Sequence, residues 1–264
     1  MKTSALNKLA QMPVNHQIVL DCLPDIPRWI EARSMLLNGR GMVLAFHSDP
    51  ETGSECSAER RAETKGALLQ QDIGLGVVIG KPDMDLIFQL SELADEIICP
   101  IENAVHCAKA LNGWSKEAAT IFLRDDQIPL PQLATSHQRV LRTGELTEID
   151  DLPELLFEEL EEEQQAGTKI YCATEDDRPL AFCYPGSLSE TYWDISIDTL
   201  EAHRREGHAT RSVIYAINQM EKQHRKPAWA AVDSNTGSRA MAGSLGFTSI
   251  DRLMVFTRNP DLAV

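Results

Sequence analysis

The sequence predicts an α/β protein built from two units, and three observations favour this class. Short apolar runs alternate with helical patterns in the first third of the 264-residue chain and again in its C-terminal half. Hydrophobic residues make up 43% of the sequence and charged residues 25%, which is ordinary for a globular protein. Pro129 and Pro131 oppose regular structure between the halves. We therefore expect an N-terminal α/β domain over residues 1–134, whose role stays open, and a second domain over 135–264.

The N-terminal elements follow from hydrophobic periodicity and from turn residues. Helical patterns are expected over residues 27–37, 58–71 and 85–93. Apolar strands are expected over residues 42–46, 76–79 and 96–99. A polar loop over 49–54 follows the first strand, and the sequence from Gly80 to Asp83 is typical of a turn.

The C-terminal half begins with a strand over 139–142 and a helix. This helix is expected to begin with Asp151 as its N-cap and Pro153 near its first turn. Its apolar stripe is expected to consist of Leu152, Leu155, Leu156 and Leu160. The remaining elements are a hairpin of two strands over 170–174 and 180–184, strands over 191–199, 229–232 and 253–256, and helices over 208–223 and 236–245. The helix over 208–223 is expected to turn Val213, Ile217 and Met220 inward.

The segment from Ile195 to Ala209 is the most informative part of the chain. It combines a strand, an acidic loop and the pattern Arg204-x-x-Gly207-x-Ala209 at the start of a helix. Glycine lets the backbone approach a ligand closely, and the free N–H groups of a first helical turn favour an anion. Arg204 and Arg205 add positive charge. The pattern predicts a pyrophosphate-binding loop, but not a Walker A loop, because no Gly-Lys-Ser/Thr follows.

Further motifs extend this pattern towards a known family. They are Ile195-x-Ile197-x-Thr199, Pro227-x-Trp229, Asn235-x-x-Ser238 and Leu245-Gly-Phe247. Together with the arginine–glycine loop, they resemble the GCN5-related N-acetyltransferase (GNAT) family, and most closely the branch that includes the zwittermicin A resistance acetyltransferase. The resemblance implies a mixed, mostly antiparallel central sheet flanked by helices. It also implies acetyl-CoA as the cosubstrate.

The same resemblance assigns cofactor contacts. It implies that the main chain of Ile197, Asp198 and Thr199 holds the pantetheine arm and the acyl carbonyl. It places the pyrophosphate at Arg204, Arg205, Glu206, Gly207, His208 and Ala209, with no chemistry for the His208 side chain. Asn235 and Ser238 stand where the family makes polar contacts to the cofactor, although Asn235 is equally suited to capping a helix.

Acyl transfer requires a neutral amine, so a general base is expected. We expect Asp194 in this role, because it lies on the strand beside the predicted cofactor channel. Asp198, Glu190 and His203 are rivals, and a base acting through water is a further alternative. Many family members have a tyrosine that protonates the leaving thiolate, but Ala242 stands at that position here.

Charge and cysteine spacing limit the partners and the compartment. The net charge of −15 argues against binding to nucleic acid or to an anionic membrane. The N-terminus lacks a signal-peptide pattern, and the six cysteines show neither paired nor metal-like spacing, so we expect a cytoplasmic protein without a metal. The nine carboxylates between Glu148 and Glu163 would suit a cationic substrate, or form a solvated helix face.

The sequence therefore predicts an N-acetyltransferase that moves acetyl from acetyl-CoA to a primary amine, expected on a small molecule, by direct attack. Two alternatives stay open. Ala242 leaves room for a non-catalytic acyl-CoA-binding module, and the sequence does not separate small-molecule amines from protein amines. A homodimer is possible.

Overall fold

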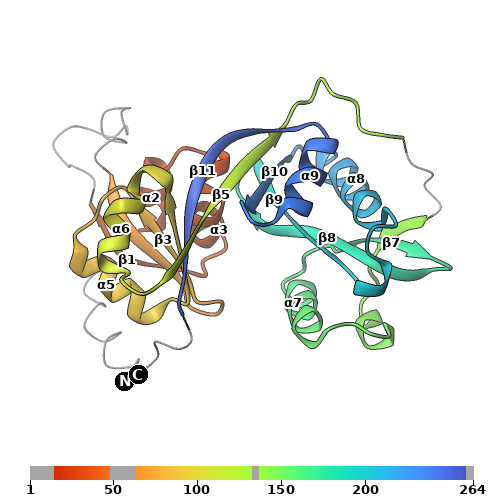
Figure 1. The fold of residues 1–264 in the computed structure, drawn as a ribbon, viewed down its shortest axis with the longest axis horizontal. Helices are drawn as coiled ribbons and strands as arrows, with labels where there is room; N and C mark the ends of the chain where they lie inside the picture. Colours follow the sequence, from red (N-terminus) through yellow and green to blue (C-terminus); the bar gives the residue numbers. More distant parts are fainter. Residues whose placement is uncertain (1–14, 48–63, 133–136, 260–264) are drawn as a thin grey trace. The chain divides into compact units, whose positions relative to one another are not determined.

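The computed structural model describes residues 15–47, 64–132 and 137–259 (Figure 1). It confirms the predicted class, a mixed α/β fold with mostly antiparallel strands and flanking helices. Contacts between Cα atoms divide the chain into two compact units. The first comprises Met1–Ile121, Ala231–Thr236 and Ser249–Val264, and the second comprises Phe122–Ala230 and Gly237–Thr248. The predicted domain boundary after residue 134 stays a prediction.

The first unit contains a sheet with the strand order β1-β2-β3-β4-β11-β5. Its strands are β1 (Gly41–His47), β2 (Lys65–Gln70), β3 (Leu75–Ile79), β4 (Glu96–Pro100), most of β5 (Ser115–Arg124) and most of β11 (Phe247–Thr257). Its helices are α2 (His16–Cys22), α3 (Ile30–Leu37), α5 (Met84–Leu93) and α6 (Ala104–Ala110), with short 3-10 turns at Pro27–Trp29 and Ile101–Asn103. The pair β3–β4 is parallel, whereas β1–β2, β2–β3 and β4–β11 are antiparallel.

The expected helix over 58–71 is wrong where the structure describes it, because residues 65–70 form strand β2. Residues 58–63 and the expected loop over 49–54 lie outside the described residues. Leu68 packs with the cluster that includes Met35 of α3, and Leu69 packs with the cluster that includes Leu90 of α5. A strand that is buried on both faces shows no polar alternation, so periodicity alone does not separate it from a helix.

The second unit contains a sheet with the strand order β10-β9-β8-β7-β6. The strands are β6 (Gln138–Val140), β7 (Tyr171–Glu175), β8 (Arg178–Leu188), β9 (Tyr192–Thr199) and β10 (Lys226–Val232), whose last two residues belong to the first unit. The helices are α7 (Glu154–Gln165), α8 (His208–Glu221) and α9 (Thr236–Ser244), with 3-10 turns at Glu145–Glu148 and Glu201–His203. The pair β9–β10 is parallel, whereas β6–β7, β7–β8 and β8–β9 are antiparallel.

Opposite faces of this second sheet carry different helices. On one face, the ring of Tyr171 in β7 packs against Tyr215 of α8, with ring centroids 5.8 Å apart. On the other face, Phe182 of β8 belongs to the same buried cluster as Leu160 of α7. Because side chains alternate along a strand, Asp194, Ser196 and Asp198 of β9 share one face; Asp198 pairs with Phe182, so this is the α7 face.

Helix α7 differs from its sequence prediction at its start and in its stripe. It begins at Glu154 after Pro153, whereas Asp151 has a left-handed φ of 60° and does not cap it. Leu160 is fully buried, and Leu156 and Phe157 pack with it. Leu155 is 80% exposed, because one residue further along a helix turns a side chain by about 100° away from the stripe. The predicted inward face of α8 is confirmed, since Val213, Ile217 and Met220 are buried.

Two segments without a sequence prediction complete the fold. Residues 104–110 form α6, and residues 115–124 form β5, which lies beside β11. Strand β11 also begins earlier than the predicted strand over 253–256, and its polar first half includes Asp251. Asp251 is bound by the guanidinium of Arg28 at 2.5 and 2.6 Å. Such polar contacts to distant residues leave no periodic pattern in the sequence.

Candidate functional site

Strands β9 and β10 begin as a parallel pair and then separate. Their paired residues run from Tyr192–Lys226 to Asp194–Ala228, after which β9 continues to Thr199 and β10 to Val232. On its other side, β9 stays paired with β8 as far as Thr199. Backbone N–H and C=O groups seek partners, so residues 195–199 present an edge of β9 that can hydrogen bond to an extended ligand.

Between this edge and α8 the chain passes through the 3-10 turn Glu201–His203 and a loop over residues 204–207. Arg205 has a φ of 66° and Gly207 a φ of 84°, and α8 begins immediately after Gly207. The N–H of Arg211 donates to the carbonyl of Gly207 at 3.1 Å, so the N–H groups of residues 208–210 precede the first helical hydrogen bond. A left-handed residue followed by right-handed ones turns successive N–H groups towards a common point, which suits an anion.

The loop is open and positively charged at this point. A Cβ atom at Gly207 would meet nothing within 4 Å, and Arg204 and Arg205 are both exposed. The first turn of α8 contains no acidic residue. The helix dipole, the free N–H groups and the two guanidinium groups therefore act in the same direction and favour an anion.

The His208 side chain turns back towards the loop and is 4% exposed. Its Nε2 lies 3.3 Å from a carboxylate oxygen of Glu206, and its Nδ1 lies 3.5 Å from a guanidinium nitrogen of Arg211. The same Glu206 oxygen lies 3.6 Å from Nδ1 of His203. Glu206 thus bridges two imidazoles and holds the loop against the start of α8.

A group of carboxylates lies on the α7 face of the sheet. Tyr184 of β8 donates a hydrogen bond to Glu159 of α7 at 2.6 Å. Burial and the neighbouring Glu159 carboxylate raise the pKa of Asp198, while Arg204 and Tyr184 act in the opposite direction. Burial and Glu159 also raise the pKa of the Tyr184 phenol. A cation between Glu159 and Asp198 would relieve the repulsion between these carboxylates.

The four candidate bases occupy different places. Asp194 is half-buried at the last paired position of β9, and Asp198 lies on the same face. Glu190 is exposed in the turn between β8 and β9. His203 lies in the 3-10 turn after β9 and faces Glu206. The structure therefore places the two aspartates on one face of β9 and Glu190 in the turn before that strand.

The predicted contacts near α9 also have structural roles. The indole N–H of Trp229 donates to the Ser238 hydroxyl at 2.8 Å, and the rings of Trp229 and Phe247 lie 5.4 Å apart. Asn235 is exposed and immediately precedes α9, the position of a helix cap. Ala242 is fully buried in α9.

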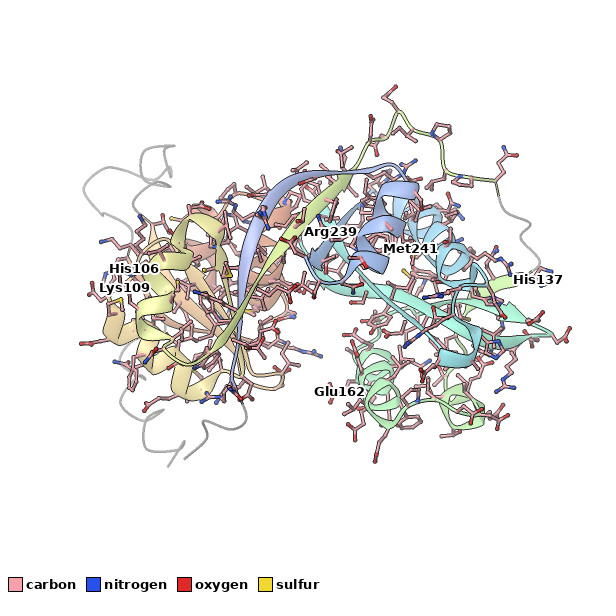
Figure 2. The ribbon with its side chains drawn as sticks, viewed as in Figure 1. His106, Lys109, His137, Glu162, Arg239 and Met241 are labelled. Atoms are coloured by element: carbon pink, nitrogen blue, oxygen red, sulfur yellow. The ribbon has the colours of Figure 1, made fainter. Side chains whose placement is uncertain are left out.

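Cys99 and Cys107, the two cysteines whose spacing most nearly resembles a cluster, are buried core residues. A hydrogen bond to Cys107 and burial raise the pKa of the Cys99 thiol. His106, which is labelled in Figure 2, contacts a different group, since its Nε2 lies 2.7 Å from the carbonyl oxygen of Pro82. These thiols therefore form part of the packing in the first unit. No helix among the described residues is long and apolar enough to cross a membrane.

Comparison with known proteins agrees with this geometry. Solved structures with a similar fold include a GCN5-related N-acetyltransferase-like protein from Streptococcus suis, with a TM-score of 0.63 and 15% identity over 92% of this chain and 98% of that one. A GCN5-related N-acetyltransferase from Kribbella flavida has a TM-score of 0.58 and 12% identity, over 96% and 98% of the two chains. At these identities the likeness defines the class, a protein with the GNAT fold.

The family model for GNAT acetyltransferases matches residues 145–256. A putative GNAT-family acetyltransferase from Novosphingobium aromaticivorans is also similar, with a TM-score of 0.54 and 14% identity over 89% of this chain and 98% of that one. No curated protein sequence matches the chain. The family model thus shows a likeness to GNAT acetyltransferases over part of the second half of the chain, and the structural neighbours show the fold.

Proposed function

We propose that the protein is an N-acetyltransferase that moves the acetyl group of acetyl-CoA to a primary amine of a small molecule. One observation carries the proposal: β9 separates from β10 and then leads, through one short turn, to an open, arginine-flanked helix start at Gly207. The edge of β9 suits the amides of a pantetheine arm, and the loop suits a pyrophosphate. The sequence motifs additionally favour the branch that includes the zwittermicin A resistance acetyltransferase.

In this proposal the cofactor is held chiefly by main chain. Ile197, Asp198 and Thr199 offer backbone groups along the free edge of β9. Arg204 and Arg205 supply charge, while Glu206, Gly207, His208 and Ala209 provide the turn and the N–H groups of the pyrophosphate loop. Asn235 and Ser238 make polar contacts to the cofactor arm. The open space beside Gly207 is where a phosphate fits and a side chain would obstruct it.

The acceptor amine arrives as an ammonium ion and must lose a proton before it attacks. Glu159 and Asp198 provide the negative charge that attracts the ammonium, which favours a cationic acceptor. Asp194 accepts the proton, directly or through water, and the amine then attacks the acetyl carbonyl without an acetylated enzyme. Ala242 has no proton to donate, so solvent protonates the leaving thiolate.

A screen of primary amines tests the activity. The protein is incubated with acetyl-CoA and separate polyamines, aminoglycosides and a lysine-containing peptide, and released CoA thiol is followed together with product mass. We expect turnover with a small cationic amine. Tight CoA binding without turnover would favour the non-catalytic alternative suggested by Ala242, and turnover with the peptide alone would favour a protein substrate. If calorimetry detects no binding of CoA to the protein, the proposal is contradicted entirely.

A further inference from the structure

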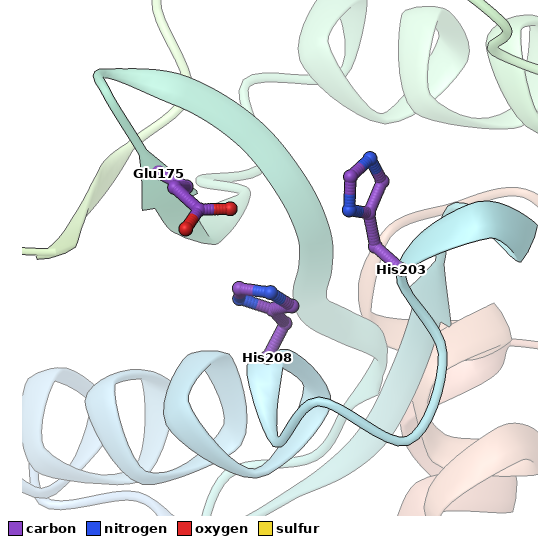
Figure 3. A group of neighbouring side chains, drawn as sticks. All are labelled: Glu175, His203 and His208. Atoms are coloured by element: carbon purple, nitrogen blue, oxygen red, sulfur yellow. The ribbon is translucent and has the colours of Figure 1, made fainter.

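Three side chains that are separated in the sequence gather beside the Gly207 loop. Glu175 ends β7, His203 ends the 3-10 turn after β9, and His208 begins α8 (Figure 3). One ligand atom from each lies within 4.8 Å of the others. The β7–β8 hairpin carries the carboxylate, whereas the loop before α8 carries the imidazoles. The cluster therefore connects two separate segments of the second unit.

Two imidazoles and a carboxylate are a donor set that Zn²⁺ and related transition metals use in proteins. Bonds of about 2.0–2.1 Å in a tetrahedral site place neighbouring donor atoms about 3.4 Å apart. Two donor separations are already close to this value, because one Glu206 oxygen lies 3.3 Å from Nε2 of His208 and 3.6 Å from Nδ1 of His203. Small rotations of exposed side chains would complete the geometry.

Burial and charge also suit a bound cation. His208 is 4% exposed and fixed at the helix start, whereas the His203 and Glu206 side chains are 29% and 54% exposed and leave a route for entry. Glu175 is exposed as well. The carboxylates of Glu175 and Glu206 offset the charge of the metal, while Arg211, next to Nδ1 of His208, is the cation that opposes it.

We propose that Glu175, His203 and His208 bind a divalent transition metal, best matched by Zn²⁺, with Glu206 as a fourth oxygen donor. A metal here would fasten the β7–β8 hairpin to the loop that contains Gly207. It would also place positive charge beside the loop. Insofar as the loop binds acyl-CoA, which rests on the proposed function, the metal should strengthen that binding.

The test uses the full chain without a histidine tag and without CoA. Zn²⁺ affinity is measured by competition with a chromophoric chelator, and Co²⁺ is added as a spectroscopic probe whose visible absorption reports four-coordinate binding. We expect one equivalent per chain. Glu175→Gln and His203→Asn should each weaken Zn²⁺ binding at least about 10- to 100-fold, since the loss of a group that merely orients a ligand already costs that much. They should also diminish the Co²⁺ absorption.

His224→Asn provides the matched control, because His224 is exposed beyond the opposite end of α8. Asparagine tolerates its left-handed φ of 59°, and metal binding should not change. Wild-type protein that binds no Zn²⁺, or variants that bind like the wild type, would overturn the proposal. The same holds if His224→Asn weakens binding as much as His203→Asn. CoA calorimetry with and without Zn²⁺ then tests the coupling, so failure of the acyl-CoA proposal is seen separately.

Discussion

Each unit contains a parallel strand pair that is joined by a helix, but the two crossovers differ where the helix begins. In the first unit, β3 and β4 end at Ile79 and Pro100, soon after their last pair of Val77 and Ile98. Helix α5 then begins after Asp83 and carries Asp85 in its first turn. These carboxylates satisfy the helix dipole from within the chain and repel an anion.

The crossover β9–α8–β10 has the opposite character. Its strands continue well beyond their last pair, and α8 begins after Arg204, Arg205 and Gly207 without an acid in its first turn. The glycines differ too. A Cβ at Gly80 would lie 2.2 Å from the Thr64 carbonyl oxygen, whereas a Cβ at Gly207 would meet nothing. The same topology thus has a closely packed glycine in one unit and an open one at the start of the helix in the other.

The largest expected effect concerns the residue at the point where the strands separate. Asp194 holds this position on β9, and the buried Val77 holds it on β3. Asp194→Asn should lower kcat about 10²–10⁴-fold, the usual contribution of a general base. Calorimetry should show unchanged CoA affinity. Glu190→Gln, which changes an exposed alternative base, is the control. A fall in kcat of less than about threefold for Asp194→Asn would mean that another group is the general base.

The next effect concerns the open glycine. Gly207→Glu should weaken CoA binding roughly a hundredfold, since two like charges about 6 Å apart repel by about 2–3 kcal/mol at an effective dielectric constant near 20. Gly167→Glu is the matched control, because Gly167 has the same φ of 84° and equally open surroundings. Equal CoA affinity in both variants, measured by calorimetry, would place the pyrophosphate away from α8.

The sequence predicts this crossover better than the rest of the fold because the relevant contacts are local. The alternation along β9, the glycine before α8 and the inward stripe of α8 lie within one short segment, so each leaves a readable pattern. Strand β2 could not be assigned, because its burial on both faces depends on helices from either side of it in the sequence. The N-cap assigned to Asp151 failed because two further residues precede the helix.

The candidate site divides in the same way. The loop from Arg204 to Ala209 could be predicted from its own residues. The proximity of the Glu159 and Asp198 carboxylates could not, because it depends on where α7 packs. No sequence spacing connects Glu159 with Asp198 or Glu175 with His208. The side chains meet only because the sheet brings β7, β8 and β9 together. A metal site is usually recognised in a sequence by cysteines or histidines at short, regular spacing. That spacing is missing here, because one proposed ligand comes from a distant hairpin.

A smaller effect separates the packed glycine from the open one by stability. Gly80→Ala combines a left-handed φ of 60° with a collision against backbone, so it should destabilise the fold by about 2–3 kcal/mol. Gly207→Ala should cost only about 1 kcal/mol, because strain is its sole cost. Urea unfolding measures both. Equal losses would mean that the space beside Gly207 is filled in solution.

The smallest expected effect is a pH dependence of stability at Asp198. Burial and Glu159 raise the pKa of this carboxyl in the folded protein above its ordinary range. Between the ordinary and the raised pKa the folded state binds more protons than the unfolded state, so stability falls as pH rises through this window and is constant above it. Asp198→Asn removes this loss. The urea midpoint of the variant minus that of the wild type should therefore be larger at neutral pH than at acidic pH.

Asp251 in the first unit supplies a control of opposite sign. Burial alone would raise the pKa of Asp251, but hydrogen bonds from Arg28 lower it overall. That carboxylate stabilises the fold above its unfolded pKa and loses this contribution as the pH falls through its folded pKa, so Asp251→Asn should be most harmful at neutral pH. Urea unfolding from about pH 3 to pH 8 covers the Asp198 window, which lies above ordinary aspartate pKa values, and enters the Asp251 window, which lies below them. If Asp198→Asn instead lost stability at neutral pH, as Asp251→Asn is expected to do, Asp198 would be a stabilising carboxylate rather than one repelled by Glu159. That result would contradict the proposal that the acidic pair on the α7 face attracts a cation.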